Sequence, residues 1–417
     1  MRLKKRTARF LLGLGGLFVG LLICEIGLRV GGFSHQRLFS MPDRYRGVAL
    51  PPNAEGWWRE EGNAYVRINS AGLRDREHAK QKPPNTFRIA VLGDSFAEAL
   101  QVPIEDTFWA ILEKKLQECP GVVGKQVEVI NFGVSGYGTA QELITLRREA
   151  WDYSPDLIML VVAPGNDIRD NSRTLSQDGP RPFFVYRGDQ LVLDDSMLEA
   201  RNSSLAYRLR ESSVGQAFGW LESHLRVLQL LDKARTLFAD RRILEKREDI
   251  ASRMKARPLN NQGAEVGLDA MIYYEPTDPA WQDAWRVTEG TITLMRDEVR
   301  SRGARFFVVT VSSGRQVNPD STARSNRLQE AGLKDFFYAE RRIKALGERE
   351  NFPVLNLAPA FQSYAEQHNV FLHGFGATLG TGHWNQEGHR LAGEIISKWL
   401  CDGMTQKVSD CDDRRLL

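Results

Sequence analysis

The feature of this sequence that most constrains its fold is a repeated alternation of short β-rich runs and amphipathic helical segments. Residues 157–163 form an uninterrupted apolar run, which is typical of a central parallel strand covered on both faces. Similar runs occur at residues 87–92, 127–131, 306–311 and 352–357, with apolar residues at helical spacing between them. Five strands separated by helices predict an α/β fold with a doubly wound parallel sheet and right-handed crossovers.

The strands fall in two parts of the chain, which predicts a main domain interrupted by an insertion. We expect the main domain to comprise residues 87–174 and 281–402, and a polar tail to follow at residues 403–417. Residues 34–86 contain short strand-like runs and form a lead-in. The gap at residues 175–280 is too long for a simple crossover and predicts a mainly helical insertion.

The insertion carries one apolar helix face and an excess of basic residues. The face comprises Leu221, Leu225, Leu228, Leu231 and Phe238, and residues 201–257 hold 13 Lys and Arg against 7 Asp and Glu. This pattern fits a solvated helical cap over the site. It also fits docking on anionic lipid headgroups beside a membrane anchor.

The N-terminal 33 residues predict a membrane-spanning signal anchor. Residues 10–24 contain no charged side chain, and residues 26–28 extend the apolar run past Glu25, to a total of about 19 residues at roughly 1.5 Å each. Five basic residues precede the run, namely Arg2, Lys4, Lys5, Arg6 and Arg9. They favour a cytoplasmic N-terminus and an exported remainder. A cleaved signal peptide and the buried helix of a cytosolic protein are the alternatives.

Charge and cysteine usage limit the classes of partner. The net charge is +3, from 56 Lys and Arg against 53 Asp and Glu, which predicts no nucleic-acid partner. The four cysteines form no CxxC pair, and neither His373 nor His389 has carboxylates at a metal-binding spacing, so we expect no metal site. In an oxidising compartment Cys401 and Cys411 would pair, although unpaired thiols remain the alternative.

Polar residues at three predicted strand ends suggest ester chemistry. Ser95 follows the first strand and would act as a nucleophile, Gly136 lies in the glycine-rich turn after the second, and Asn166 follows the third. Reactive groups of such sheets lie beyond the carboxyl ends of the strands. His383, directly before the last helix, would supply the base. Taken singly, each of these residues also fits a helix cap or a turn.

These four blocks together resemble the SGNH hydrolases, also called the GDSL esterase and lipase family. The resembling motifs are Gly93-Asp94-Ser95-Phe96, Gly136, Gly165-Asn166-Asp167 and His383-Trp384-Asn385, and residues 68–75 look like a segment of bacterial members with a single N-terminal anchor. The resemblance implies a three-layer flavodoxin-like sandwich with five parallel strands. It also implies Ser95 as nucleophile, His383 as base, and an oxyanion hole formed by the Ser95 N–H, the Gly136 N–H and the Asn166 side chain, without a cofactor.

One position departs from the family pattern. Family members usually carry an Asp two or three residues before the catalytic His, where this chain has Gly380 and Thr381. The acid would then come from elsewhere, with Asp94, Asp167 and Glu387 as candidates. Alternatively a backbone carbonyl orients the ring, or the protein has lost its activity.

The predicted function is that of a serine esterase acting on acyl esters, O-acetyl esters among them, at the exported face of the membrane. Its substrates would be acylated small molecules, glycans or lipids. An O-acyltransferase on envelope polysaccharide and an inactive carbohydrate-binding or scaffold protein are the alternatives. The esterase interpretation requires that Ser95 and His383, 288 positions apart, meet at one edge of the sheet.

Overall fold

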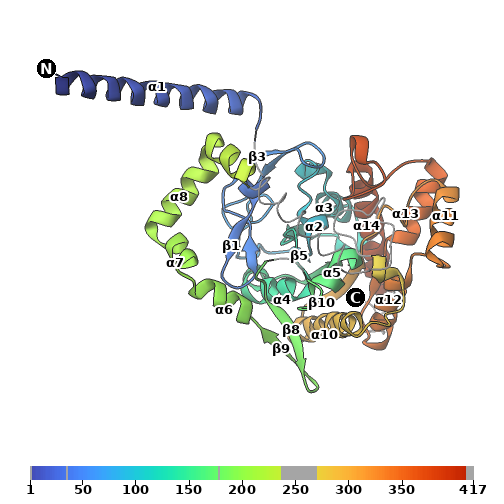
Figure 1. Cartoon of the computed structure of the whole chain (residues 1–417). Coiled ribbons are helices and arrows are strands. Elements are labelled where there is room, and N and C mark those ends of the chain that lie inside the picture. Colours follow the sequence, from blue (N-terminus) through green and yellow to red (C-terminus); the bar gives the residue numbers. More distant parts are fainter. Residues whose placement is uncertain (1, 34–35, 177–178, 236–269, 410–417) are drawn as a thin grey trace.

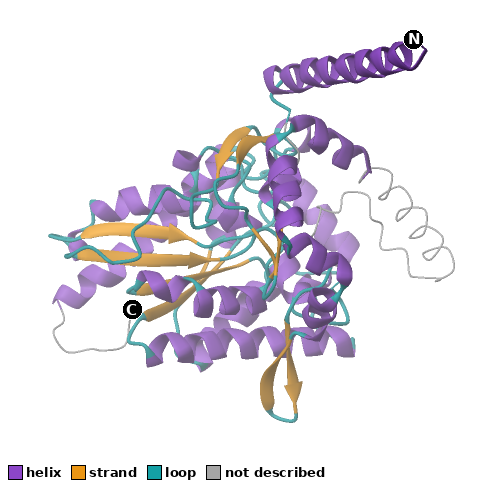
Figure 2. Ribbon diagram, turned by 90° about the vertical axis from the view of Figure 1, so that its left-hand side faces the viewer, coloured by secondary structure: helices purple, strands orange, loops and turns teal. Residues whose placement is uncertain are grey.

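A five-stranded parallel sheet forms the centre of the molecule, as seen in a computed structural model that describes residues 2–33, 36–176, 179–235 and 270–409. Its order is β11 (Val354–Asn356), β10 (Arg305–Thr310), β7 (Leu157–Val162), β5 (Thr86–Leu92) and β6 (Gln126–Asn131). Each neighbouring pair is parallel. All five predicted strands are present, which confirms the predicted α/β fold class (Figures 1 and 2).

Helices cover both faces of the sheet because successive strand residues point to opposite sides. Ala90 and Leu92 of β5 belong to one apolar cluster, whereas Ile89 and Val91 belong to the other. The first cluster is closed by α4 (Thr139–Arg148), α10 (Pro279–Ser301) and α12 (Tyr338–Arg349). The second is closed by α3 (Phe108–Gln117), α13 (Ala358–His368) and α14 (Gln386–Ser409), and α14 runs on into the predicted polar tail. The result is a three-layer sandwich.

The lead-in folds as two antiparallel hairpins that pack on the main domain. They are β1 (Met41–Asp43) with β2 (Gly47–Ala49) and β3 (Glu55–Trp58) with β4 (Ala64–Arg67). Their buried side chains form a third apolar cluster with residues of the main domain, including Val134 and Tyr137. The lead-in is therefore part of the same folded body.

The segment that resembles anchored family members fastens the lead-in to the carboxyl end of β6. One carboxylate oxygen of Asp75 accepts from the Asn131 N–H at 2.9 Å, and the Asn131 amide donates to the Arg74 carbonyl at 3.2 Å. Asn131 in turn accepts from the Gly133 N–H at 3.0 Å. Residues 68–75 thus help to order the glycine-rich turn after the second strand.

The described part of the insertion contains a hairpin as well as helices. Strands β8 (Phe183–Arg187) and β9 (Gln190–Asp194) precede α6 (Ser196–Ser203), α7 (Leu205–Glu211) and α8 (Ser213–His224). The predicted continuous helix face is interrupted, because α8 ends at an extended Leu225 before residues 226–235 resume a helix. Phe238, the last residue of that predicted face, lies outside the described residues.

The N-terminal segment forms a helix, α1 (Arg2–Val30), that projects from the body (Figure 1). Its residues Phe10–Val30 are apolar and long enough to cross a membrane, and none of the most apolar window is buried. The buried core helix considered from the sequence does not fit this exposure. A membrane anchor and a signal sequence both remain compatible with the helix.

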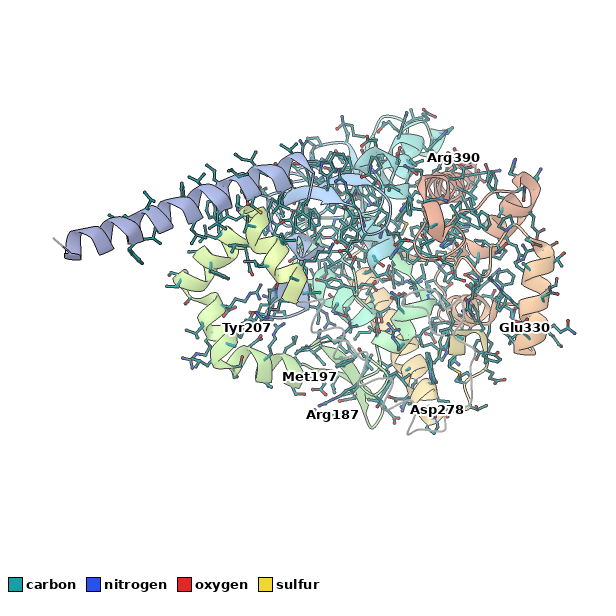
Figure 3. The ribbon with its side chains drawn as sticks, turned by 45° about the horizontal axis from the view of Figure 1, so that its top comes forward. Arg187, Met197, Tyr207, Asp278, Glu330 and Arg390 are labelled. Atoms are coloured by element: carbon teal, nitrogen blue, oxygen red, sulfur yellow. A yellow bond between two sulfur atoms is a disulfide. The ribbon has the colours of Figure 1, made fainter. Side chains whose placement is uncertain are left out.

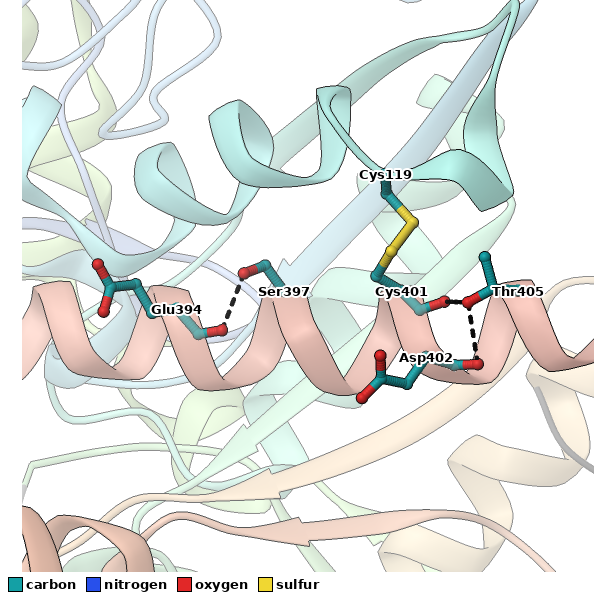
Figure 4. The surroundings of a disulfide bond; sticks show 6 residues. All are labelled: Cys119, Glu394, Ser397, Cys401, Asp402 and Thr405. Atoms are coloured by element: carbon teal, nitrogen blue, oxygen red, sulfur yellow. Dashed lines mark hydrogen bonds between the residues drawn. A yellow bond between two sulfur atoms is a disulfide. The ribbon is translucent and has the colours of Figure 1, made fainter.

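The disulfide in the structure differs from the predicted one. Cys401, on α14, is bonded to Cys119, which follows α3, with the two Cα atoms 5.7 Å apart (Figure 4). The predicted Cys401–Cys411 pair is therefore wrong, and Cys411 itself lies outside the described residues. This pairing could not be predicted from sequence, because it joins positions 282 residues apart that meet only when α3 and α14 pack on the same face of the sheet.

Candidate active site

Ser95 and His383 meet at the carboxyl end of β5. Ser95 is the first residue of α2 (Ser95–Glu98), a short helix that Asp94 caps by accepting from the Phe96 N–H. His383 lies in the loop before α14, and its Nε2 is 2.8 Å from Ser95 Oγ. The spatial condition set by the sequence is met, since both side chains reach the same edge of the sheet.

The third member of the arrangement is Glu61, which the sequence did not suggest. Its Oε2 lies 2.5 Å from His383 Nδ1, and its Oε1 accepts from the His383 N–H at 2.8 Å. A carboxylate only accepts, so Nδ1 carries the hydrogen and Nε2 is free to accept the Ser95 hydroxyl proton. Glu61 belongs to the turn between β3 and β4, so the lead-in supplies a carboxylate where the last loop has none.

Gly382 makes room for this contact. A Cβ at position 382 would lie 2.3 Å from Glu61 Oε1, and the residue has φ +77°. Both conditions favour glycine. Gly380 and Thr381, which stand where the family pattern has an Asp, do not bond to the His383 ring. The Thr381 hydroxyl donates to the Thr378 carbonyl, and the Gly380 N–H donates to the His373 carbonyl.

His373 supports the loop that carries His383 by a hydrogen bond to the adjacent Gly382. Its Nδ1 donates to the Gly382 carbonyl at 2.7 Å, which leaves Nε2 to accept from the Ser312 hydroxyl at 2.9 Å. Burial lowers the pKa of His373 to about 4, so the ring is neutral and can donate through Nδ1 while it accepts through Nε2. His389 lies on α14, where burial lowers its pKa to about 3. Neither ring contacts Ser95.

The three carboxylates proposed from the sequence as substitutes have other partners. Asp94 accepts from the Phe96 N–H and from the Asn166 amide, and Asp167 accepts from the Ala163 N–H at 2.7 Å. Glu387 pairs with Arg390 at 2.6 Å and accepts from the Tyr364 hydroxyl. Since Glu61 occupies the Nδ1 side of His383, none of these three orients the ring.

The predicted oxyanion donors come from the three strand ends. Asn166 lies on α5 (Pro164–Asp170), and its Nδ2 donates one hydrogen to Asp94 Oδ2 at 2.7 Å, which leaves the second hydrogen available. Gly136 has φ +78°, a backbone that glycine adopts without strain. Within the described ranges, the Ser95 and Gly136 N–H groups donate to no protein acceptor. These donors are therefore free to bind a ligand.

A buried glutamate fixes the turn that contains Gly136. Glu98, at the end of α2, accepts from both the N–H and the hydroxyl of Ser135, the N–H at 2.7 Å. Burial raises the pKa of Glu98 to about 7, against the opposing effect of the Ser135 donors and of Arg74. The Val134 N–H also donates to the Gly93 carbonyl at 3.1 Å. The turn that carries Ser95 and the turn that carries Gly136 are thus joined directly by hydrogen bonds.

The charge of Glu61 sets the basicity of the candidate base. Burial alone would lower the pKa of His383, but the hydrogen bond and the negative charge of Glu61 outweigh it, so the pKa is raised above 6.5. The same pair lowers the pKa of Glu61 although its partial burial acts in the opposite sense. About a quarter of the His383 side chain (26%) is exposed, so the imidazole borders the solvent from which a substrate would come.

Comparison with known proteins gives esterases and lipolytic proteins. No protein-family model matches the chain. A curated arylesterase of Vibrio mimicus is 32% identical over 82 residues, which cover 20% of this chain and 39% of that protein. The chain thus spans about two fifths of the length of this relative.

The chain is also similar to solved structures, at low identity. A lipolytic protein of the G-D-S-L family from Desulfitobacterium hafniense is 12% identical, with 75% of this chain and 98% of that chain covered and a TM-score of 0.33. A lipase/acylhydrolase from Enterococcus faecalis is 14% identical, with 76% and 96% covered and a TM-score of 0.35.

Proposed function

We propose that this protein is a serine ester hydrolase of the SGNH type, with Ser95 as nucleophile, His383 as general base and acid, and Glu61 as the acid that orients His383. The observation that carries the proposal is the unbroken chain of hydrogen bonds from Ser95 Oγ through His383 to Glu61. A nucleophile, a base and an orienting carboxylate at hydrogen-bond distance are the geometry that ester cleavage requires.

In the proposed first half-reaction, Ser95 Oγ attacks the ester carbonyl while His383 Nε2 takes the hydroxyl proton. The resulting imidazolium is stabilised by the adjacent Glu61 carboxylate, whose bond to Nδ1 stays in place throughout. His383 then gives the proton to the leaving alcohol, and an acyl-Ser95 ester remains. In the second half-reaction, water gives a proton to the same Nε2 and attacks this ester. His383 then returns that proton to Ser95 Oγ as the acyl–oxygen bond breaks and the carboxylic acid leaves.

The negative charge on the carbonyl oxygen is stabilised by the donors around Ser95. We assign this role to the Ser95 N–H, the Gly136 N–H and the second Nδ2 hydrogen of Asn166. Donors that are already fixed before the reaction stabilise the developing oxyanion without reorganisation. The Asp94–Asn166 and Glu98–Ser135 bonds supply that fixation.

Turnover of p-nitrophenyl acetate by the full-length chain in detergent tests the proposal, with Ser95→Ala as the matched variant. We expect the variant to lose at least about 10³-fold in kcat/KM while it keeps its thermal unfolding midpoint, since it removes one oxygen atom. A fluorophosphonate should label the parent chain and not the variant. Equal turnover by both proteins would refute the esterase proposal and favour a binding or scaffold function.

We further propose that α1 anchors the protein uncleaved and places the active site on the exported face of the membrane. The basic residues that precede the apolar run favour a cytoplasmic N-terminus, and the Cys119–Cys401 disulfide fits an oxidising compartment. Acyl esters of the cell envelope, O-acetyl esters among them, would then be the accessible substrates. Hydrolysis and acyl transfer use the same residues, so analysis of the products distinguishes an esterase from a transferase.

A further inference from the structure

Two consecutive helices of the insertion expose large apolar side chains to solvent. On α8, Val214, Phe218 and Leu221 lie at helical spacing on one side, and α7 exposes Leu205 and Leu209. Phe218 is 55% exposed and Val214 80%. We call these five residues the apolar stripe. The two helices contact each other, and large apolar side chains exposed together on a folded protein mark an interaction site.

The helix that carries most of the apolar stripe ends beside the last turns of the candidate membrane anchor. Glu25 Oε2 accepts from the Val227 N–H at 3.0 Å, and the Arg29 guanidinium donates to the His224 carbonyl, so the last turns of α1 are bonded to the residues that follow α8. The Lys233 ammonium lies 5.8 Å from the centre of the Phe33 ring. In Figures 1 and 3 the helices α6–α8 occupy the side of the body from which α1 projects.

The β3–β4 hairpin adds an aromatic pair at the same place. Trp57 and Tyr65 lie side by side on its outer face, with ring centres 5.6 Å apart, and both are more than a third exposed. The Arg59 guanidinium lies 4.8 Å from the Trp57 ring and donates to the carbonyls of Gly31 and Gly32, just after α1. Trp and Tyr beside basic groups are typical of membrane–water interfaces.

We propose that the apolar stripe and the Trp57–Tyr65 pair dock on the surface of the bilayer that α1 enters, with the stripe inserted below the headgroups. The occupant is the membrane because α8 ends beside the last turns of α1, whose residues Phe10–Val30 are apolar and long enough to cross a bilayer. A helix with an apolar face and basic residues beside it lies in the interface plane; Arg208 and Arg210 lie on α7, and Arg226 follows α8. This inference rests on the proposed anchor and is independent of the proposed ester chemistry.

Docking would also fix the orientation of the active site toward the membrane. Arg59, which holds the residues after α1, is two positions from Glu61, which holds His383. The turn that supplies the acid is thus bonded to the anchor on one side and to the base on the other. A site held in this way faces substrates near the bilayer surface.

The proposal is tested with nitroxide labels on the full-length protein in lipid nanodiscs. For each label we measure the accessibility to oxygen, which concentrates in lipid, and to a nickel chelate, which stays in water. One sample is labelled at Phe218→Cys and a second at Gln216→Cys, two positions away on α8, each in a chain with Cys24→Ser and Cys411→Ser. A third is labelled at native Cys24 on α1, in a Cys411→Ser chain. The discs contain phosphatidylcholine with or without phosphatidylglycerol and are prepared in two sets, with one protein per disc and with two.

We expect the label at position 218 to report lipid, with an oxygen-to-nickel accessibility ratio at least about fivefold above that of the label at position 216. A water-exposed label at 218 together with a lipid-exposed Cys24 would overturn the docking proposal and leave the anchor standing. Water exposure at both would refute the anchor as well. Shielding at 218 that appears only when two copies share a disc would assign the apolar stripe to a second copy of this chain and refute the membrane as its occupant. A thermal unfolding curve verifies separately that each labelled protein is folded, whether or not the protein is an esterase.

Discussion

At the residue scale, the contact between Glu61 and His383 gives the most direct test of the site geometry. We expect Glu61→Gln to lower kcat by about 10²- to 10⁴-fold, because a neutral amide no longer stabilises the imidazolium and permits the wrong His383 tautomer. The unfolding midpoint should change little, since Gln keeps the size of the side chain. Steady-state turnover of p-nitrophenyl acetate with a thermal melt of each protein measures both effects.

The neighbouring Glu60 provides the matched control for this variant. Glu60→Gln makes the same chemical change one residue earlier in the same turn, at a carboxylate whose Oε1 lies 4.0 Å from the Lys233 ammonium. It should leave kcat within about twofold of the parent, because this exposed pair makes no hydrogen bond to Ser95 or His383 in the described chain and contributes little to stability. If Glu61→Gln were as active as Glu60→Gln, Ser95 and His383 would act as a dyad and Glu61 would have no catalytic role.

The pH dependence of the reaction follows from the same pair. The base must be neutral to accept the Ser95 proton, and Glu61 raises the pKa of His383 above 6.5. The rate of the parent enzyme should therefore rise with pH through that raised value, and the acid limb of kcat/KM should lie above pH 6.5. In Glu61→Gln the positive imidazolium loses its partner, so the limb should move to lower pH. A limb that stays in place would show that another group sets the pKa of His383.

At the scale of elements, the Cys119–Cys401 disulfide joins the segment directly after α3 to α14 on one face of the sheet. We expect Cys119→Ser with Cys401→Ser to lower the free energy of unfolding by about 2–5 kcal/mol, since the bond closes a loop of 282 residues in the unfolded chain. The bond lies on helices that flank the sheet and contacts neither Ser95 nor His383. Activity at 25 °C should therefore be retained while the unfolding midpoint falls by several degrees.

Reduction of the parent protein supplies the control for the disulfide prediction. Dithiothreitol should lower the unfolding midpoint of the parent and leave that of the double variant unchanged. Cys24→Ser, which alters an exposed cysteine of α1, should behave as the parent does. A parent that melts at the same temperature with and without reductant would contradict the contribution assigned to this bond.

The sequence predicted the strands and the residues at their ends because both depend on local pattern. An apolar run such as residues 157–163 identifies a buried strand, and parallel strands place their carboxyl ends together, so Ser95, Asn166 and His383 were placed at one edge.

Glu61 and Cys119 could not be found in this way. Each contacts a partner about 300 residues away in the sequence, and the contact forms only when distant elements pack together. No motif near Glu61 distinguishes it from other glutamates as the carboxylate that orients His383. The only signal was indirect, since Gly380 and Thr381 left His383 without a local carboxylate.

At the scale of the whole molecule, the lead-in connects the end of α1 to the candidate active site. Its β3–β4 turn binds the residues after α1 through Arg59 and the base through Glu61. Its Asp75 binds the end of β6 and thereby supports the Gly136 turn. The lead-in therefore contributes to the active site itself, and its removal should abolish activity even where the sheet still folds.

Two truncations separate anchoring from this support. Removal of residues 1–30 deletes α1 but leaves the Gly31 and Gly32 carbonyls to which Arg59 donates. The shortened protein should stay in solution without detergent and keep kcat on p-nitrophenyl acetate within about twofold, because no contact of α1 reaches Ser95, His383 or Glu61 in the described chain. Membrane sedimentation after carbonate extraction, with turnover of the supernatant, measures both properties.

Removal of residues 1–33 additionally deletes both acceptors of Arg59, which then retains the Asn63 side chain at 3.3 Å. The turn that holds Glu61 loses two hydrogen bonds on its anchor side, so His383 should be less firmly oriented and kcat should fall by a further factor of roughly 3–10, because small displacements of a catalytic group are costly. Activity that is equal in the two truncated proteins would show that the anchor end does not support the Glu61 turn. A 1–30 truncation that still sediments with membranes would place the membrane attachment elsewhere, with the apolar stripe of α7 and α8 as the first surface to test.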